Sequence, residues 1–217
     1  MTLGLIHPSR GRPQKAYVTY KKWIDFAGHS DLYVNHILSI DRNDTKAGEY
    51  KGFFGGEKSY VLESNNNSVV EATNHAAKES KSDILLYLSD DFDCFENWSV
   101  SVLKEFEGVT EPMLLKVDDC LQSFNVPVLT IPIMNRALYN KLGYFWHPGY
   151  KSMFVDEDLY WTAHNLGALK FAPHLKFEHQ HVSVGKAQDD ETYRRSAANW
   201  DQGKAFFRQR KAQGFPL

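Results

Sequence analysis

Three acids fall within four residues at one point of the sequence, where they could hold a metal ion. Asp90, Asp91 and Asp93 directly follow a nearly unbroken apolar run at residues 83–88. Carboxylates this close repel one another unless a positive charge lies among them, and oxygen ligands of this kind suit Mg²⁺ or Mn²⁺. We therefore predict a divalent cation, Mn²⁺ or Mg²⁺, at this point. Acids of a solvated loop are the alternative interpretation.

Two histidines form a second candidate for metal binding. His179 and His181 alternate after an expected strand at residues 169–177, so in an extended chain both side chains point the same way. Either could complete the coordination of the cation, and zinc is a competing occupant because imidazole suits it. A structural role for each histidine is the other possibility.

A third acidic group, Asp156 to Asp158, lies at the expected start of a helix over residues 156–165. A carboxylate there could deprotonate a substrate hydroxyl as a general base. Acids are also favoured at a helix N-terminus by the helix dipole, without any catalytic role. The residue pattern alone leaves both interpretations open.

Basic residues follow the first apolar run of the chain. Arg10 and Arg12 lie in a turn-rich segment after residues 3–6. Guanidinium groups can bind phosphate through two hydrogen bonds, which makes an anionic ligand one interpretation of this loop. Surface arginines in a turn are the other.

The elements that must position these residues follow from periodicity and turn signals. The first half alternates strands and helices, which favours a mainly parallel sheet with helices on its faces. Ligands bind beyond the carboxyl ends of such strands, where the residues around Arg10, Asp41 and Asp91 would meet. We expect strands at residues 3–6, 32–40, 59–62, 83–88, 113–117, 126–133 and 169–177, and helices at 14–26, 68–78, 135–142, 156–165 and 189–213.

Three segments, in this order, resemble motifs of family 2 glycosyltransferases and related GT-A enzymes. Together they cover roughly residues 3–181. The segments are Pro8-Ser9-Arg10-Gly11-Arg12-Pro13, then Leu88-Ser89-Asp90-Asp91-Phe92-Asp93 with Trp98 downstream, then Gly143-Tyr144-Phe145 followed by Phe154-Val155-Asp156-Glu157-Asp158-Leu159.

The resemblance implies an α/β fold with a single GT-A-like, Rossmann-related domain over residues 1–185. Its nucleotide-binding half would span about 1–98 and its acceptor half about 99–185. Residues 186–217 would form a C-terminal helical extension.

The resemblance also implies a reaction, the metal-dependent transfer of a sugar from a nucleotide-sugar donor to an acceptor hydroxyl with inversion, whereas a retaining reaction would need no general base. Asp156 is the first choice for the general base, with Glu157 or Asp158 as substitutes. The metal ligands would be Asp91, shared by both possible registers of the acidic motif, with Asp93, His179 and His181. Donor-binding residues would be Pro8, Ser9, Arg10, Arg12, Asp41, Asp44, Asn74 and Asp90.

The acceptor stays open between a glycan, a small molecule, a protein and modified DNA, as in phage-type enzymes. The net charge of -2 supplies no global attraction to nucleic acid, although a basic cluster near the C-terminus would permit a polyanion. A solvated helix face also explains that cluster. Its members are Arg194, Arg195, Lys204, Arg208, Arg210 and Lys211.

The apolar segments and the cysteines predict where the protein is located. No segment approaches the 18 apolar residues of a membrane span, and the two cysteines, Cys94 and Cys120, fit reduced thiols, so we expect a cytoplasmic protein. The oligomeric state is not determined by these patterns.

The alternatives to a transferase are a nucleotidyltransferase, which lacks a convincing lysine-bearing loop here, and a non-catalytic module that binds nucleotide or sugar.

Overall fold

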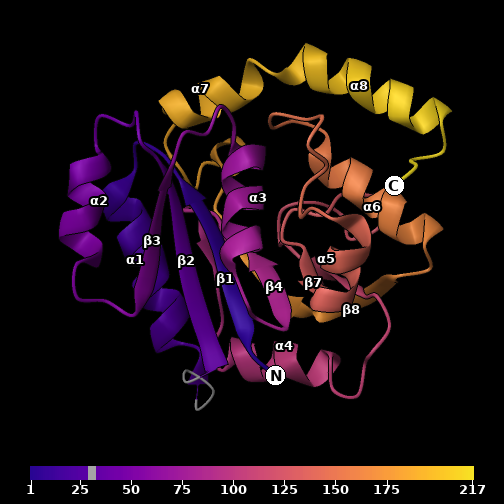
Figure 1. The fold of residues 1–217 in the computed structure, drawn as a ribbon, viewed down its shortest axis with the longest axis horizontal. Helices are drawn as coiled ribbons and strands as arrows, with labels where there is room; N and C mark the ends of the chain where they lie inside the picture. The colour runs from indigo at the N-terminus through magenta and orange to yellow at the C-terminus, as the bar shows by residue number, and fades with distance from the viewer. Residues whose placement is uncertain (29–32) are drawn as a thin grey trace.

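A mixed but mainly parallel sheet forms the centre of the protein (Figure 1). The computed structural model describes residues 1–28 and 33–217, and within them this sheet has seven strands in the order β3-β2-β1-β4-β7-β6-β8. A small second sheet pairs β5 with β9. The strands are β1 (Leu3–Ser9), β2 (Val34–Asp41), β3 (Ser59–Ser64), β4 (Ile84–Tyr87), β5 (Phe92–Asp93), β6 (Leu114–Asp118), β7 (Ile133–Asn135), β8 (Leu169–Lys176) and β9 (Glu178–His179).

Helices cover both faces of the central sheet. In β1, Leu3 and Leu5 pack into one hydrophobic cluster with Trp23 and Trp98, whereas Ile6 packs into the other with Leu138. Successive strand residues point to opposite faces, so this strand is buried on both sides. The helices are α1 (Pro13–Asp25), α2 (Ala47–Phe54), α3 (Val69–Glu79), α4 (Trp98–Glu105), α5 (Arg136–Leu142), α6 (Val155–Asn165), α7 (Glu191–Ala197) and α8 (Trp200–Ala212), with a short 3-10 helix, η2 (Val182–Val184).

The strand directions confirm the predicted α/β fold with a mainly parallel sheet. β3, β2, β1 and β4 run parallel, and so do β6 and β8, while β7 is antiparallel to both of its neighbours. The carboxyl ends of β1, β2 and β4 therefore lie at one edge, where the sequence places Arg10, Asp41 and Asp91.

Several element boundaries differ from expectation. The strand expected at residues 126–133 is wrong, because only Ile133 at its end belongs to β7. Pro127 and Pro132 have no N–H to give to a ladder, and the carbonyls of Val126 and Val128 instead accept hydrogen bonds from the Lys116 ammonium. The first strand continues beyond residue 6 to Ser9.

Other boundaries agree closely or fall outside the structure. The predicted N-cap of the second helix is confirmed, since the Ser68 hydroxyl accepts a hydrogen bond from the Glu71 N–H at 3.1 Å. The strand expected at residues 32–40 corresponds to β2, with its predicted first residue, Leu32, outside the described residues. Helices α2 and α4 were not predicted.

The C-terminal helical extension is confirmed as two helices, α7 and α8, which run across the top of the molecule in Figure 1. α8 packs through Phe206 on Tyr150, with ring centroids 4.8 Å apart, and Trp200 stands 4.8 Å from Phe154. None of the described helices is both long and apolar enough to cross a membrane.

Candidate active site

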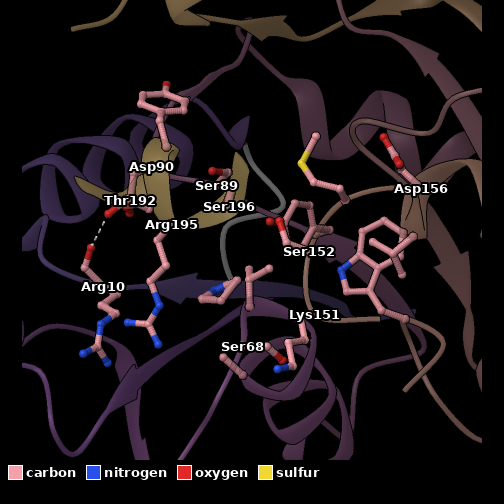
Figure 2. A pocket seen from close by; sticks show the side chains of 18 of the residues that line it. Arg10, Ser68, Ser89, Asp90, Lys151, Ser152, Asp156, Thr192, Arg195 and Ser196 are labelled. Atoms are coloured by element: carbon pink, nitrogen blue, oxygen red, sulfur yellow. Dashed lines mark hydrogen bonds between the residues drawn. The ribbon is translucent and has the colours of Figure 1, made fainter. Parts of the chain in front are cut away.

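A cleft of about 330 Å³ opens at the carboxyl ends of β1, β2 and β4. Its size lies within the range of small-molecule sites in proteins. The second half of the chain supplies the opposite wall, from the segment before α6 and from α7 (Figure 2). Most of the site residues predicted from the sequence line this cleft, namely Pro8, Ser9, Arg10, Arg12, Asp41, Asp90, Asp91, Asp156, His179 and His181.

Asp91 is buried at the inner end of the cleft. One of its oxygens, Oδ2, accepts a hydrogen bond from the Tyr193 hydroxyl at 2.6 Å and lies 3.5 Å from His179 Nε2. The other, Oδ1, is buried without a hydrogen-bond partner in the described structure. Burial alone would raise the pKa of Asp91, but His179 and the Tyr193 hydroxyl outweigh it and hold the pKa well below its usual range. Asp91 is therefore an anion with a free oxygen.

The pairing of β5 with β9 brings the histidines to this carboxylate. Phe92 pairs with His179, and the Gln180 N–H donates to the Asp91 carbonyl at 2.8 Å. The Nδ1 atom of His179 is buried and lacks a partner among the described residues. The rings of His179 and His181 lie 4.9 Å apart, and burial lowers the pKa of His181. Both predicted histidines thus lie beside Asp91.

Asp93, predicted as a second metal ligand, faces away from the cleft. Its carboxylate lies 2.5 Å from the Lys22 ammonium and accepts a hydrogen bond from the Cys94 N–H. In the part of the chain that the structure describes, no group of three or more His, Cys, Asp and Glu residues has the arrangement of a metal site.

The loop after β1 is held by the two acids expected to bind the donor. Gly11 adopts a φ of 70°, which favours glycine, and its N–H donates to Asp44 at 2.6 Å. Arg10 pairs with Asp41. Asp41 lines the cleft, but Asp44 does not, and it supports this loop instead.

Arg12 binds the C-terminal extension. Its guanidinium makes two hydrogen bonds to Asp190, at 2.6 and 2.7 Å, and stands over the Tyr193 ring at 4.5 Å from the centroid. Burial would lower the pKa of Arg12, but Asp190, with Asp90 and Asp91 nearby, raises it.

Asp90 lies at the cleft within a buried polar network. Its carboxylate is bonded to His7 Nε2 at 2.9 Å and accepts the Ser9 hydroxyl at 2.9 Å. His7 in turn contacts His36 at 3.0 Å, and burial, followed by the neighbouring His7, lowers the pKa of His36. The network fixes the position of the Asp90 carboxylate.

The two predicted catalytic acids on α6 have different surroundings. Asp156 lines the cleft, on the opposite side from Arg10 in Figure 2, and burial raises its pKa. Asp158 lies outside the cleft, fully enclosed, where it pairs with Arg210 at 2.9 Å and accepts the Tyr150 hydroxyl at 2.9 Å. The structure therefore does not support Asp158 as a general base, because its carboxylate is held inside the protein.

Asn74, predicted to bind the nucleotide-sugar donor, instead joins two segments of the fold. Its side chain accepts hydrogen bonds from the N–H groups of Phe145 and Trp146 and donates to the Trp146 carbonyl. These three bonds fasten α3 to the segment after α5, and Asn74 does not line the cleft.

The sequence did not identify the cleft residues that α7 contributes. Thr192 donates to the Arg10 carbonyl at 3.1 Å, and Tyr193 reaches Asp91. No motif marks these positions, since they lie about 100 residues from Asp91 in the sequence and were part of an expected charged helix.

The C-terminal basic cluster does not act as one set. Arg210 is buried against Asp158, Arg194 pairs with Asp189 at 3.0 Å, and Arg195 lines the cleft. The remaining members, Lys204, Arg208 and Lys211, are exposed on α8. This distribution does not single out a polyanion surface.

Comparisons with known proteins are informative at the level of structure. No protein-family model matches the sequence, and a search of the curated proteins finds no match. Among solved structures, residues 1–349 of S. aureus TarS in complex with UDP align with a TM-score of 0.65 and 11% identity, over 82% of this chain and 60% of that one.

A second similar structure comes from another organism. The mannosyltransferase PcManGT from Pyrobaculum calidifontis, in complex with GDP-Man and Mn²⁺, aligns with a TM-score of 0.66 and 10% identity, over 81% of this chain and 56% of that one. The chain thus spans less than two thirds of the length of these proteins. Its fold is that of GT-A-type glycosyltransferases, as the ordered motifs predicted.

Proposed function

We propose that this protein is a metal-dependent glycosyltransferase, which moves a sugar from a nucleotide-sugar donor to an acceptor hydroxyl with inversion. The observation that carries the proposal is the Asp91 carboxylate, buried at the carboxyl edge of the sheet with one oxygen free, in a cleft shared with Arg10 and Asp156. Structures of the same fold were solved with UDP, with UDP-GlcNAc, and with GDP-Man and Mn²⁺.

The residues at Asp91 fit a divalent cation. The free Asp91 oxygen and the unpartnered His179 nitrogen are buried polar atoms, a costly state that an additional ligand would relieve. Asp91 and His179, with His181 beside them, would hold the cation, and Mg²⁺ or Mn²⁺ commonly takes further ligands from substrate phosphates. When bound, the cation supplies charge stabilisation to the leaving diphosphate.

The donor nucleotide would lie along the loop after β1. Pro8, Ser9, Arg10 and Asp41 line this part of the cleft, and Arg12 holds its outer side through Asp190. Asp90, fixed by His7 and Ser9, retains lone pairs that can accept a hydrogen bond from a ribose hydroxyl.

Asp156 is the proposed general base. It faces the cleft, and its carboxylate accepts a hydrogen bond from the neighbouring Glu157 N–H at 3.0 Å. A raised pKa strengthens a carboxylate as a base, and inversion requires a base on the face opposite the leaving group.

A thermal-shift panel tests the proposal. UDP-, GDP-, ADP- and CDP-sugars are each added with and without Mn²⁺, and we expect metal-dependent stabilisation by one nucleotide. A ligand at a hundred times its Kd stabilises a fold by about 2.7 kcal/mol. Asp91→Asn should abolish this shift, and the bound donor should release its nucleoside diphosphate in the presence of Mn²⁺.

Asp93→Asn is the matched control, because Asp93 lies two residues from Asp91 but outside the cleft. It should retain the full shift. If all four donors leave the melting temperature unchanged in both conditions, the transferase proposal fails. Binding without release of diphosphate would favour a non-catalytic module instead.

A further inference from the structure

Two basic side chains in the cleft have no partner among the described residues. Lys151 and Arg195 both line it, and within the described residues neither side chain forms an ion pair or a hydrogen bond. We infer that Lys151 and Arg195 form a binding site for a phosphate group of the ligand in this cleft. The inference rests on the proposed function, which supplies a phosphate-bearing ligand.

The other charges of the cleft are already balanced or already assigned. Arg10 pairs with Asp41, Arg12 with Asp190, and Asp90 is bonded to His7. Asp91 is the proposed metal ligand and Asp156 the proposed base. Lys151 and Arg195 are therefore the basic side chains of the cleft that have neither a partner among the described residues nor an assigned role, and such cations attract an anion.

Both residues lie on segments that the fold holds in place. Lys151 follows Tyr150, a buried residue whose hydroxyl donates to Asp158. Arg195 lies on α7, which is tied to the sheet side of the cleft by the Arg12–Asp190 pair and by the Tyr193–Asp91 hydrogen bond. The two cations thus reach one cavity from two separate segments of the second half of the chain.

The side-chain directions agree with a shared ligand. In Figure 2 the Arg195 and Lys151 side chains extend to the same side of the pocket, where the Arg195 guanidinium lies next to Arg10 and the Lys151 ammonium next to Ser68. A guanidinium offers paired donors in a plane and an ammonium offers a point charge, and both are common phosphate-binding groups. The phosphate could belong to the donor diphosphate or to the acceptor.

Glutamine variants test the inference, because they remove each charge while retaining a long polar side chain. Isothermal titration measures the affinity of Lys151→Gln and Arg195→Gln for the nucleoside diphosphate selected in the panel, and for the matching nucleoside. Arg194→Gln is the matched control, since Arg194 is the adjacent arginine, is exposed, and pairs with Asp189. Circular dichroism confirms that each variant is folded.

For a donor phosphate, each cleft variant should bind the nucleoside diphosphate about tenfold more weakly, as expected for loss of a charged hydrogen bond. Nucleoside affinity and Arg194→Gln should be unchanged. For an acceptor phosphate, diphosphate affinity should be unchanged, while binding of inorganic phosphate to the nucleotide-loaded protein without metal should be lost in the cleft variants. Either result supports the inference.

Equal affinities for both probes in wild type and cleft variants would overturn it. This outcome is distinct from failure of the proposed function, in which the wild-type protein itself binds no nucleotide. In that case inorganic phosphate and pyrophosphate, titrated against the free protein, still measure the site. Their binding to wild type but not to the cleft variants would support it, and the absence of any difference would reject it.

Discussion

Two pairs of aspartates, each spaced by two residues, divide in the same way. On β5 and just before it, Asp91 faces the cleft and Asp93 faces Lys22. On α6, Asp156 faces the cleft and Asp158 pairs with Arg210. In the helix, a spacing of two turns the side chain by about 200°, which separates Asp156 from Asp158. In a regular strand the same spacing would keep both side chains on one face, so Asp91 and Asp93 diverge because Asp91 lies in the turn before β5. At both places one acid is left for a ligand and the other fastens the scaffold.

The largest expected effect comes from the cleft-facing acid of α6. Asp156→Asn should lower kcat by about 10²- to 10⁴-fold, the usual contribution of a general base. Wild-type activity should fall as the pH drops through a pKa above the ordinary aspartate range, because burial raises the pKa of Asp156 and only the carboxylate accepts a proton. Rate measurements across pH check both points, with Glu157→Gln as the neighbouring control.

Asp156→Asn should lower activity but raise the stability of the fold. A carboxyl whose pKa is raised by folding stabilises the fold below its unfolded pKa, and this contribution is lost as the pH rises through the folded value. At neutral pH the buried charge is unfavourable, so Asp156→Asn should raise the melting temperature. An inactive variant with a lowered melting temperature would instead indicate a structural role.

The partner acid on α6 should affect stability first. Asp158→Ala leaves the buried Arg210 charge without its carboxylate, and loss of one member of a buried pair costs about 3–5 kcal/mol. Chemical denaturation measures the free energy of unfolding. Replacing both residues with apolar ones, Asp158→Leu and Arg210→Met, should recover much of the loss. A single variant as stable as wild type would remove the distinction between the two acids of α6.

A smaller effect is expected at Asp91. Tyr193→Phe removes the hydroxyl that donates to Asp91 Oδ2. In the wild-type protein a cation that binds this oxygen must displace that hydrogen bond, whereas in the variant there is no hydrogen bond to displace. Mn²⁺ affinity should rise about tenfold, the lower end of the value of one hydrogen bond to a charged group. Calorimetric titration with Mn²⁺ tests this, with Thr192→Val as control on the same helix. Weaker Mn²⁺ binding would show that Tyr193 assists the site.

The smallest effect is expected from the outward acid of β5. Lys22→Met breaks the pair with Asp93, in which both side chains are partly exposed, at 39% and 22%. Pairs of this kind contribute about 0.2–1 kcal/mol, so the free energy of unfolding should change little and nucleotide binding not at all. Loss of the metal-dependent shift in this variant would place Asp93 within the site after all.

The sequence by itself determined the sheet and its carboxyl edge. Apolar segments before Arg10, Asp41 and Asp91 identified strands, the last of them as a nearly unbroken run buried on both faces, and local caps such as Ser68 identified helix starts. These features depend on neighbours in the sequence, which a pattern can record. They were sufficient to predict the fold and the cleft residues at the strand ends.

Only the tertiary structure decided which polar residues were already occupied. Asp44 and Asn74 hold loops, Asp158 is bonded to a residue 52 positions away, and Arg12 is bonded to one 178 positions away. The contributions of Tyr193 and Arg195 likewise depend on how α7 packs. A charged residue is free for a ligand only if no distant partner satisfies it, and such partners are set by long-range packing rather than by local periodicity.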